Sequence, residues 1–383
     1  MQGGLTHEKR RSAVSEDYWL GVTPEVTLFV VDPRWQLQLT YALTGALHTR
    51  FPTEIANRLS MSMNGEVSRR TTFFLTAEGN QSTLSTFLLT RPVTATPVSV
   101  LPPSATHLLT LATRQGLTWE ASPVVKLGES IDGTYVTTLD SSPRFNSQSA
   151  NLTLTADRTW EVDSLGLEAR GGVAVTSPPP PDLSQKLVTL NGGPRWGHDF
   201  SRSLSSTVSA GPAMIASVSS SSKPRYSVAG RGSLLYTWET ASAELIYAHG
   251  FEPSILFAQV LRSHQGTLRG TFPISQEARV YASASVGYQW GTFVNLRANA
   301  VPRSDIQLVL ADVGIGWGVL DWLQVFGRYQ LFAQTGGAIA PNEPPLTRNA
   351  VVLGVQLQSD PPGGSPGVGA RRPQRVDQSD VAR

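Results

Sequence analysis

Large apolar and polar side chains alternate along most of this chain. In the segment WQLQLTYALTGALH (residues 35–48), odd positions carry mostly large apolar side chains and even positions carry polar or small ones. Successive side chains of a β-strand point to opposite faces of the sheet, so the pattern predicts a strand with one apolar and one polar face. The alternation recurs to the C-terminus and is clearest over residues 277–291 and 321–334.

These predicted strands are longer than the five or six residues typical of soluble sheets. The sequence therefore predicts an all-β fold, namely a single large antiparallel transmembrane β-barrel with an apolar exterior and a wet interior. The pattern places about 17 strands in the chain. They are expected at residues 19–31, 35–49, 55–67, 71–84, 105–119, 122–138, 146–158, 160–176, 183–197, 203–217, 225–238, 241–252, 256–272, 277–291, 304–318, 321–334 and 346–358.

Connections between the predicted strands alternate in length. Tight ones, such as residues 32–34 and 157–159, alternate with long connections that contain proline, such as residues 85–106 and 335–345. Outer-membrane barrels have short periplasmic turns and long extracellular loops, so each rim is assigned to one side of the membrane. Tryptophans near the tight connections predict an aromatic girdle at that rim. They are Trp35, Trp119, Trp160, Trp196, Trp238, Trp317 and Trp322.

Strand direction adds a constraint on strand number. With periplasmic tight turns, the first and last predicted strands both run inward, whereas bacterial single-chain barrels have even strand numbers. We therefore expect about 16–18 strands, with one further strand and the export signal encoded upstream of Met1. A strand wrongly split or merged within residues 71–90 is the alternative explanation.

The domain organisation predicted is one barrel with two irregular ends. Residues 1–17 are polar and charged where an export signal would have an apolar run, so we expect a disordered or mis-started segment. The barrel is expected over residues 18–358. Residues 359–383 are rich in Pro, Gly, Asp and Arg without periodicity, which predicts a disordered tail.

Composition narrows the classes of partner and chemistry. The 31 basic and 29 acidic residues give a net charge of +2, so charge offers no reason to expect a nucleic-acid partner. The absence of cysteine removes disulfides, thiolate metal sites and Cys nucleophiles. No apolar run approaches the roughly 18 residues of a transmembrane helix. The mean hydropathy of -0.12 suits a barrel, whose strands spend half their residues on a polar side.

Patterns typical of catalytic or metal sites are missing. The six histidines show no i, i+4 spacing. There is no Gly-x-Ser-x-Gly elbow, so a serine hydrolase built on a barrel is a minor alternative. Gly314, Gly316 and Gly318 alternate on one strand face and indicate close strand packing, because no helix follows them as in a phosphate-binding loop. The sequence therefore predicts no enzyme, no cofactor and no metal.

Charged residues on the predicted inner face are the candidate functional residues. Arginine outnumbers carboxylate in this set, which predicts that the pore, if open, favours anions or acidic polymers. Pairing of these arginines with loop carboxylates, which would only brace the wall, is the alternative. Small polar residues on the predicted inner face, such as Ser205, Thr207 and Ser209, indicate that side chains do not fill the barrel interior, as a conduit requires. The candidate pore-lining residues are Arg58, Arg170, Arg231, Arg269, Arg279, Arg328, Arg348, Glu168 and Glu244.

Two hairpins, at residues 68–72 and 157–160, end a strand in a polar and basic turn and restart it with Thr or Trp, and residues 57–63 lead into the first of them. In these features the chain resembles the porin-like outer-membrane β-barrels of Gram-negative bacteria, more narrowly those encoded beside exopolysaccharide export genes. The resemblance covers about residues 18–358. It implies an export conduit in the cell outer membrane. The missing export signal and a last strand without a terminal aromatic depart from the family's pattern.

Three functions stay open. The leading prediction is a conduit for exopolysaccharide export, with outer-membrane lipids, polysaccharide and a periplasmic polysaccharide-export protein as partners. A general or solute-specific diffusion porin that passes small anionic solutes is the alternative within the same class. A soluble all-β structural or adhesive protein is the alternative from another class. Its blade repeats would recur every 40 to 50 residues or so, and none is found.

Overall fold

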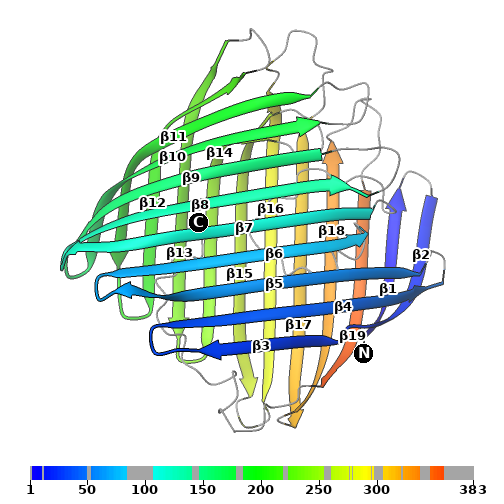
Figure 1. Cartoon of the computed structure of the whole chain (residues 1–383). Coiled ribbons are helices and arrows are strands. Elements are labelled where there is room, and N and C mark those ends of the chain that lie inside the picture. Colours follow the sequence, from blue (N-terminus) through cyan, green and yellow to red (C-terminus); the bar gives the residue numbers. More distant parts are fainter. Residues whose placement is uncertain are drawn as a thin grey trace.

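One β-sheet contains every strand of the part of the chain that the structure describes (Figure 1). The structure is a computed structural model and describes residues 2–10, 13–49, 53–83, 107–139, 146–177, 184–218, 223–253, 260–275, 277, 279–294, 296, 305–320, 322–336 and 346–357. These residues include no helix long and apolar enough to cross a membrane. The strands are β1 (Gln2–Arg10), β2 (Ala13–Val22), β3 (Glu25–Val31), β4 (Trp35–His48), β5 (Glu54–Ser68), β6 (Thr71–Thr83), β7 (His107–Ser122), β8 (Val125–Thr138), β9 (Asn146–Thr159), β10 (Asp163–Ser177), β11 (Gln185–Asp199), β12 (Leu204–Ser217), β13 (Arg225–Trp238), β14 (Ala241–Pro253), β15 (Val260–Ser275), β16 (Val280–Val294), β17 (Ile306–Leu320), β18 (Leu323–Gly336) and β19 (Leu346–Leu357).

All strand pairings are antiparallel, and from β4 to β19 each strand pairs with the next one along the chain. β1 pairs with both β19 and β2, and β2 pairs with β4 through four residue pairs, so the pairings lead back to β4. In Figure 1 the near strands β4 to β9 run across the view while the far strands β15 to β18 run from top to bottom. This crossing is what strands tilted about a common axis produce.

β2 and β3 together occupy one position in the wall. Both pair with β4, and they are separated only by Thr23 and Pro24. Proline has no backbone N–H to donate, which accounts for the break in the ladder at this point. The 19 strands therefore fill 18 wall positions, an even number, as strand direction predicts.

The N-terminal segment corrects two sequence-based predictions. Residues 1–17 were expected to lack regular structure, and the eighteenth wall strand was expected upstream of Met1. Instead, Gln2–Arg10 forms β1, and β2 begins at Ala13. The alternation did not indicate β1 because its sequence is polar. In the structure β1 pairs with β2, next to it in the chain, and with β19, and β2 pairs with β4. The predicted C-terminal tail lies outside the described residues.

Most of the tight connections lie at one end of the wall, which we call the turn end. They include residues 32–34, 69–70, 123–124 and 239–240. Glu239 adopts a φ of 46°, the left-handed conformation that the commonest type of two-residue hairpin turn has at this position. The opposite end, which we call the loop end, holds the longer connections. Most of their residues, such as 84–106, lie outside the described part of the chain.

The two faces of the wall follow the predicted alternation. On β16, Val286, Tyr288 and Trp290 point outward and are exposed, whereas the intervening Gln289 is 5% exposed and points inward. Tryptophans at the turn end lie exposed on the outer face: Trp119, Trp160, Trp196, Trp238, Trp317 and Trp322. The sequence therefore predicted the orientation of the wall side chains correctly in these strands.

Candidate functional site

The inner face of the wall carries ion pairs that join different strands, either adjacent ones or ones with a single strand between them. Arg58 on β5 donates to Glu25 on β3 at 3.0 Å. Arg328 on β18 donates from Nε to Asp312 on β17 at 2.6 Å. In a wall that alternates faces, such pairs satisfy inward charges without help from loops.

Arg269 and Glu244 form a further inner pair, directly opposite each other on β15 and β14. Glu244 is 7% exposed, so its carboxylate relies on the guanidinium for solvation. A weaker contact joins Arg170 on β10 to Asp132 on β8, with 3.9 Å between Nη2 and Oδ1. Asn151, which lies between them on β9, donates to the same carboxylate at 2.7 Å.

These contacts correct the charge balance predicted for the inner face. The expectation that arginine outnumbers carboxylate there is wrong for the described residues. Carboxylates on the inner face that the sequence analysis did not single out include Asp17, Glu25, Glu54, Asp132, Asp157 and Asp312. The arginine partners named above are therefore carboxylates of the wall itself, not of the loops.

A glycine allows one of these pairs to form across a whole strand. Asp157 on β9 accepts a hydrogen bond from Arg195 on β11 at 3.1 Å, with β10 between them. Gly166 of β10 lies between the two residues, opposite both in the ladder. A Cβ at Gly166 would stand 2.1 Å from the Asp157 carboxylate and 2.4 Å from the Ala156 carbonyl. Only glycine therefore leaves room for this contact.

Arg231 differs from the other inner arginines. It lies on β13, opposite Ser209 of β12 and Ala248 of β14, neither of which is charged. Within the described part of the chain, no hydrogen bond or ion pair to its guanidinium is found. The charges that act on it at longer range come from Arg170, Glu168, Arg114 and Glu244. The middle of the inner wall thus contains a guanidinium that has no hydrogen-bond or ion-pair partner among the described residues.

The remaining candidates lie in different settings. Glu168 is on the inner face of β10, two residues from Arg170. Arg348 lies opposite Phe332 of β18. Arg279 was expected inside a strand but has a φ of 53° and belongs to the turn before β16, where its carbonyl accepts from the Gly318 N–H at 3.0 Å. The alternation extends through this turn in the sequence, so the pattern alone could not place the strand start.

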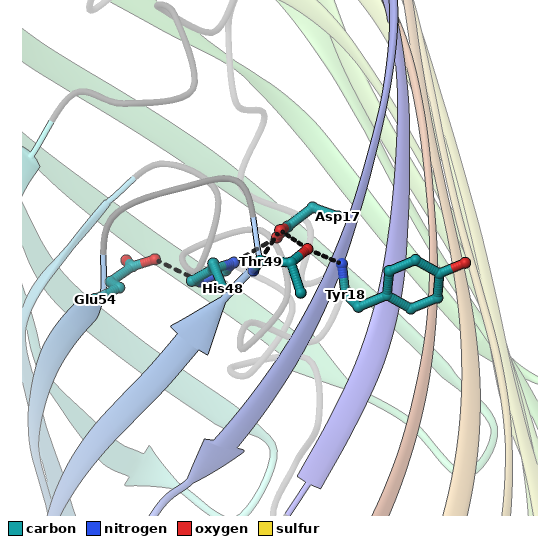
Figure 2. A network of polar contacts seen from close by, with 5 residues as sticks. All are labelled: Asp17, Tyr18, His48, Thr49 and Glu54. Atoms are coloured by element: carbon teal, nitrogen blue, oxygen red, sulfur yellow. Dashed lines mark hydrogen bonds and ion pairs between the residues drawn. The ribbon is translucent and has the colours of Figure 1, made fainter.

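A buried polar network joins β2, β4 and β5 at the loop end (Figure 2). Asp17 Oδ2 lies 2.5 Å from His48 Nδ1, and Glu54 Oε2 lies 3.8 Å from His48 Nε2. All three side chains are at most 5% exposed. Asp17 Oδ1 also accepts from the backbone N–H and the hydroxyl of Thr49, at 3.0 and 3.1 Å. Tyr18 contributes only backbone groups: its N–H donates to the Thr49 hydroxyl and its carbonyl accepts from the Thr49 N–H, while its ring points away from the network.

This network lies directly beside the short ladder between β2 and β4, whose first pair is Trp19 with His48. The sequence analysis missed it because Asp17, His48 and Glu54 are separated by a whole strand or a loop. The network supplies side-chain bonds where only four residue pairs hold the two strands together. We found no cluster of metal-ligating side chains in the described residues.

Apolar side chains cover the inner face near the loop end. Leu187 and Ile215 are at most 1% exposed and belong to one apolar cluster with Ala174 and Val260. Leu296, from the connection that follows β16, is 3% exposed and belongs to the same cluster. A residue of a loop connection therefore lies against the wall. The interior at the loop end is for this reason narrower than the strands alone would make it.

Comparison with known proteins adds only distant likenesses in fold. No protein-family model matches the sequence, and no curated protein matches it. The structure is similar to the ferric citrate transporter FecA, with 9% identity and a TM-score of 0.42 over 92% of this chain and 63% of that one. It is similar to the FrpB iron transporter of Neisseria meningitidis, with 8% identity and a TM-score of 0.46 over 89% of this chain and 64% of that one. It is also similar to OccK2 (OpdF) of Pseudomonas aeruginosa in complex with glucuronate, with 10% identity and a TM-score of 0.41 over 93% of this chain and 96% of that one.

Proposed function

We propose that this chain forms a channel in the outer membrane through which small solutes diffuse, with a preference for anions. The observation that carries the proposal is the two-faced wall. The outer face exposes a dense set of large apolar residues, while ion pairs and amides line the inner face. A lipid exterior and an aqueous interior account for both faces, because each residue type then meets the solvent that favours it.

The height of the apolar exterior supports a membrane location. Trp317 of β17 lies at the turn end, opposite Val280 of β16. Trp290 lies ten residues farther along β16, toward the loop end. The ten-residue separation spans about 33 Å along the strand. With a strand tilt of 35–45°, this gives a height of about 25 Å, which matches the apolar band of outer-membrane barrels.

Arg231 supports the preference for anions. Most other candidate arginines face a wall carboxylate, so they contribute little net field to the interior. The Arg231 guanidinium has no such partner among the described residues and can donate to a carboxylate or phosphate group in transit. Small anionic solutes are therefore the substrate class that we assign.

A more specific alternative is a conduit for exopolysaccharide. It is suggested by the resemblance of the hairpin sequences to those of barrels encoded beside exopolysaccharide export genes. The Leu296 cluster favours small solutes over a polymer, since it adds a packed apolar layer to the interior. We assign no catalytic activity to the chain. Its partners under this proposal are outer-membrane lipids and the solutes themselves.

Conductance of the refolded chain in a planar bilayer tests the proposal. We expect stable current steps, and a reversal potential in a salt gradient that has the sign of anion preference. Reversal potentials of the opposite sign would contradict the anion preference alone. Large steps that an added acidic polysaccharide blocks would favour the export conduit instead. A chain that stays soluble without detergent and never inserts would overturn the membrane location.

A further inference from the structure

A stack of three rings lies on the outer face of the wall near the loop end. His249 of β14 and His264 of β15 are directly opposite each other in the ladder, and their rings are stacked with 4.0 Å between centroids. Trp290 of β16 lies opposite His264 and stacks on its other side at 5.2 Å. Leu245, Leu268 and Tyr288 are exposed on the outer face of the same three strands. Each ring residue lies an even number of positions from one of them, so all three rings face outward.

The hydrogen bonds of the imidazoles leave one nitrogen on each ring available. His249 Nδ1 donates to the Ser263 carbonyl at 2.9 Å, and His264 Nδ1 lies 2.7 Å from the Tyr247 hydroxyl. Within the described residues, neither Nε2 atom has a hydrogen-bond partner. An Nε2 that carries a proton is therefore a donor without an acceptor among the described residues.

A guanidinium adds to the positive character of this surface. Arg262 is exposed on the same outer face of β15, two residues from His264 toward the loop end. On the described outward positions of β14, β15 and β16 there is no carboxylate to balance it. Tyr247, His249, Arg262, His264 and Trp290 together form what we call the loop-end patch.

We propose that the loop-end patch binds the phosphate group of a glycolipid in the outer leaflet of the membrane. This inference rests on the proposed function, because the outer-membrane location places the patch at the level where lipid headgroups meet acyl chains. Arg262 donates charge-assisted hydrogen bonds to the phosphate oxygens, and each imidazole adds a hydrogen bond where its Nε2 carries a proton. Trp290 occupies the interfacial position that indole rings prefer, and Leu245 and Leu268 line the path of the acyl chains below it.

Native mass spectrometry of the refolded full-length chain tests the proposal. The probes are a diphosphorylated glucosamine-disaccharide lipid and the same lipid without its phosphates. We expect the chain to retain the phosphorylated lipid, and the combined His249→Ala, Arg262→Ala and His264→Ala variant to lose about tenfold in affinity. Arg158→Ala is the matched control, since Arg158 is an exposed outward arginine at the turn end, and it should retain the lipid.

Two results would overturn the inference. One is equal retention of the phosphorylated lipid by the combined variant and the wild type. The other is equal retention of the two lipids by the wild type. The single variant Arg262→Ala, at an exposed position that leaves the ring stack intact, should still lose part of the affinity and guards against misfolding of the combined variant. Conductance separates the proposals: a combined variant that conducts normally but loses the lipid supports the patch, whereas a wild-type chain that never inserts removes both proposals together.

Discussion

The two halves of the barrel interior are built on different physical principles. Near the loop end the contacts are buried: Leu187 and Ile215 are at most 1% exposed and belong to an apolar cluster, and the side chains of the Asp17, His48 and Glu54 network are at most 5% exposed. Toward the turn end, the inner wall carries charge pairs, among them Arg195 with Asp157 and Arg328 with Asp312.

Because of this difference, the residues that stabilise the barrel are expected to differ from the residues that select the solute. Close apolar packing adds to the free energy of unfolding wherever it is found, but it offers no polar group to a solute. Charged groups in a wet interior contribute less to stability, because solvent screens them, but they set which ions pass. We therefore expect the loop half to govern stability and the turn half to govern permeation, and four substitutions test this division.

The largest loss of stability is expected for Asp17→Ala in the buried network at the loop end. The substitution leaves His48 and the Thr49 donors without their common acceptor. Breaking a buried charged pair costs about 3–5 kcal/mol. Urea unfolding of the chain in lipid vesicles measures the change. Glu161→Ala, at an exposed turn residue, is the control, and an equally small effect of both variants would contradict the structural role of the network.

Leu187→Ala probes the apolar layer of the loop half. Leu187 is 1% exposed, and its truncation leaves a cavity against Ile215 and Leu296. We expect a loss of about 2–5 kcal/mol in the free energy of unfolding. Leu190→Ala on the same strand is the matched control, because Leu190 is 50% exposed on the outer face. If the two variants lose equal stability, the loop half has no packed layer.

Gly166→Ala tests the crossing of β10 by the Asp157 and Arg195 pair. The new Cβ would collide with the Asp157 carboxylate and the Ala156 carbonyl, so the pair must separate or the backbone must shift. The expected loss is about 1–3 kcal/mol. Gly266→Ala on β15 serves as the comparison, because a Cβ there meets no atom within 4 Å. Equal unfolding midpoints for the two variants would argue against a crossing that depends on glycine.

The smallest energetic effect is expected for Arg231→Gln, which is aimed at selectivity. Without a partner in the described wall, Arg231 contributes little to folding, so stability should stay near that of the wild type. The ratio of anion to cation permeability should fall about two- to threefold, since one unpaired charge leaves the interior. Reversal potentials measure this ratio. Arg269→Gln is the companion variant, because it removes a paired guanidinium and leaves Glu244 exposed to cations.

The alternation of side chains was enough to predict the wall strands from β4 onward and the outward position of residues such as Trp317 and Tyr288. Period-two alternation is a local property, so it survives without knowledge of the neighbouring strands. The same rule failed for β1, whose sequence is polar. It also misplaced Arg279, because a connection of four residues, 276–279, can preserve the alternation on either side.

The candidate site depended on pairings that no local pattern contains. Arg231 and Arg269 have similar sequence surroundings, yet one faces Ser209 and Ala248 while the other faces Glu244. The difference is decided by the register of adjacent strands. The partner of Arg195 is 38 residues away and becomes reachable only because Gly166 lies between them.

Strand length and the two faces of the wall could thus be predicted from the sequence, because both follow from the spacing of apolar residues and turns. Which charges cancel, which guanidinium stays available and which inner residues are buried were decided by the assembled sheet. A charge or an apolar side chain acquires its effect from what stands opposite it, and in an antiparallel barrel that neighbour is set by register and closure.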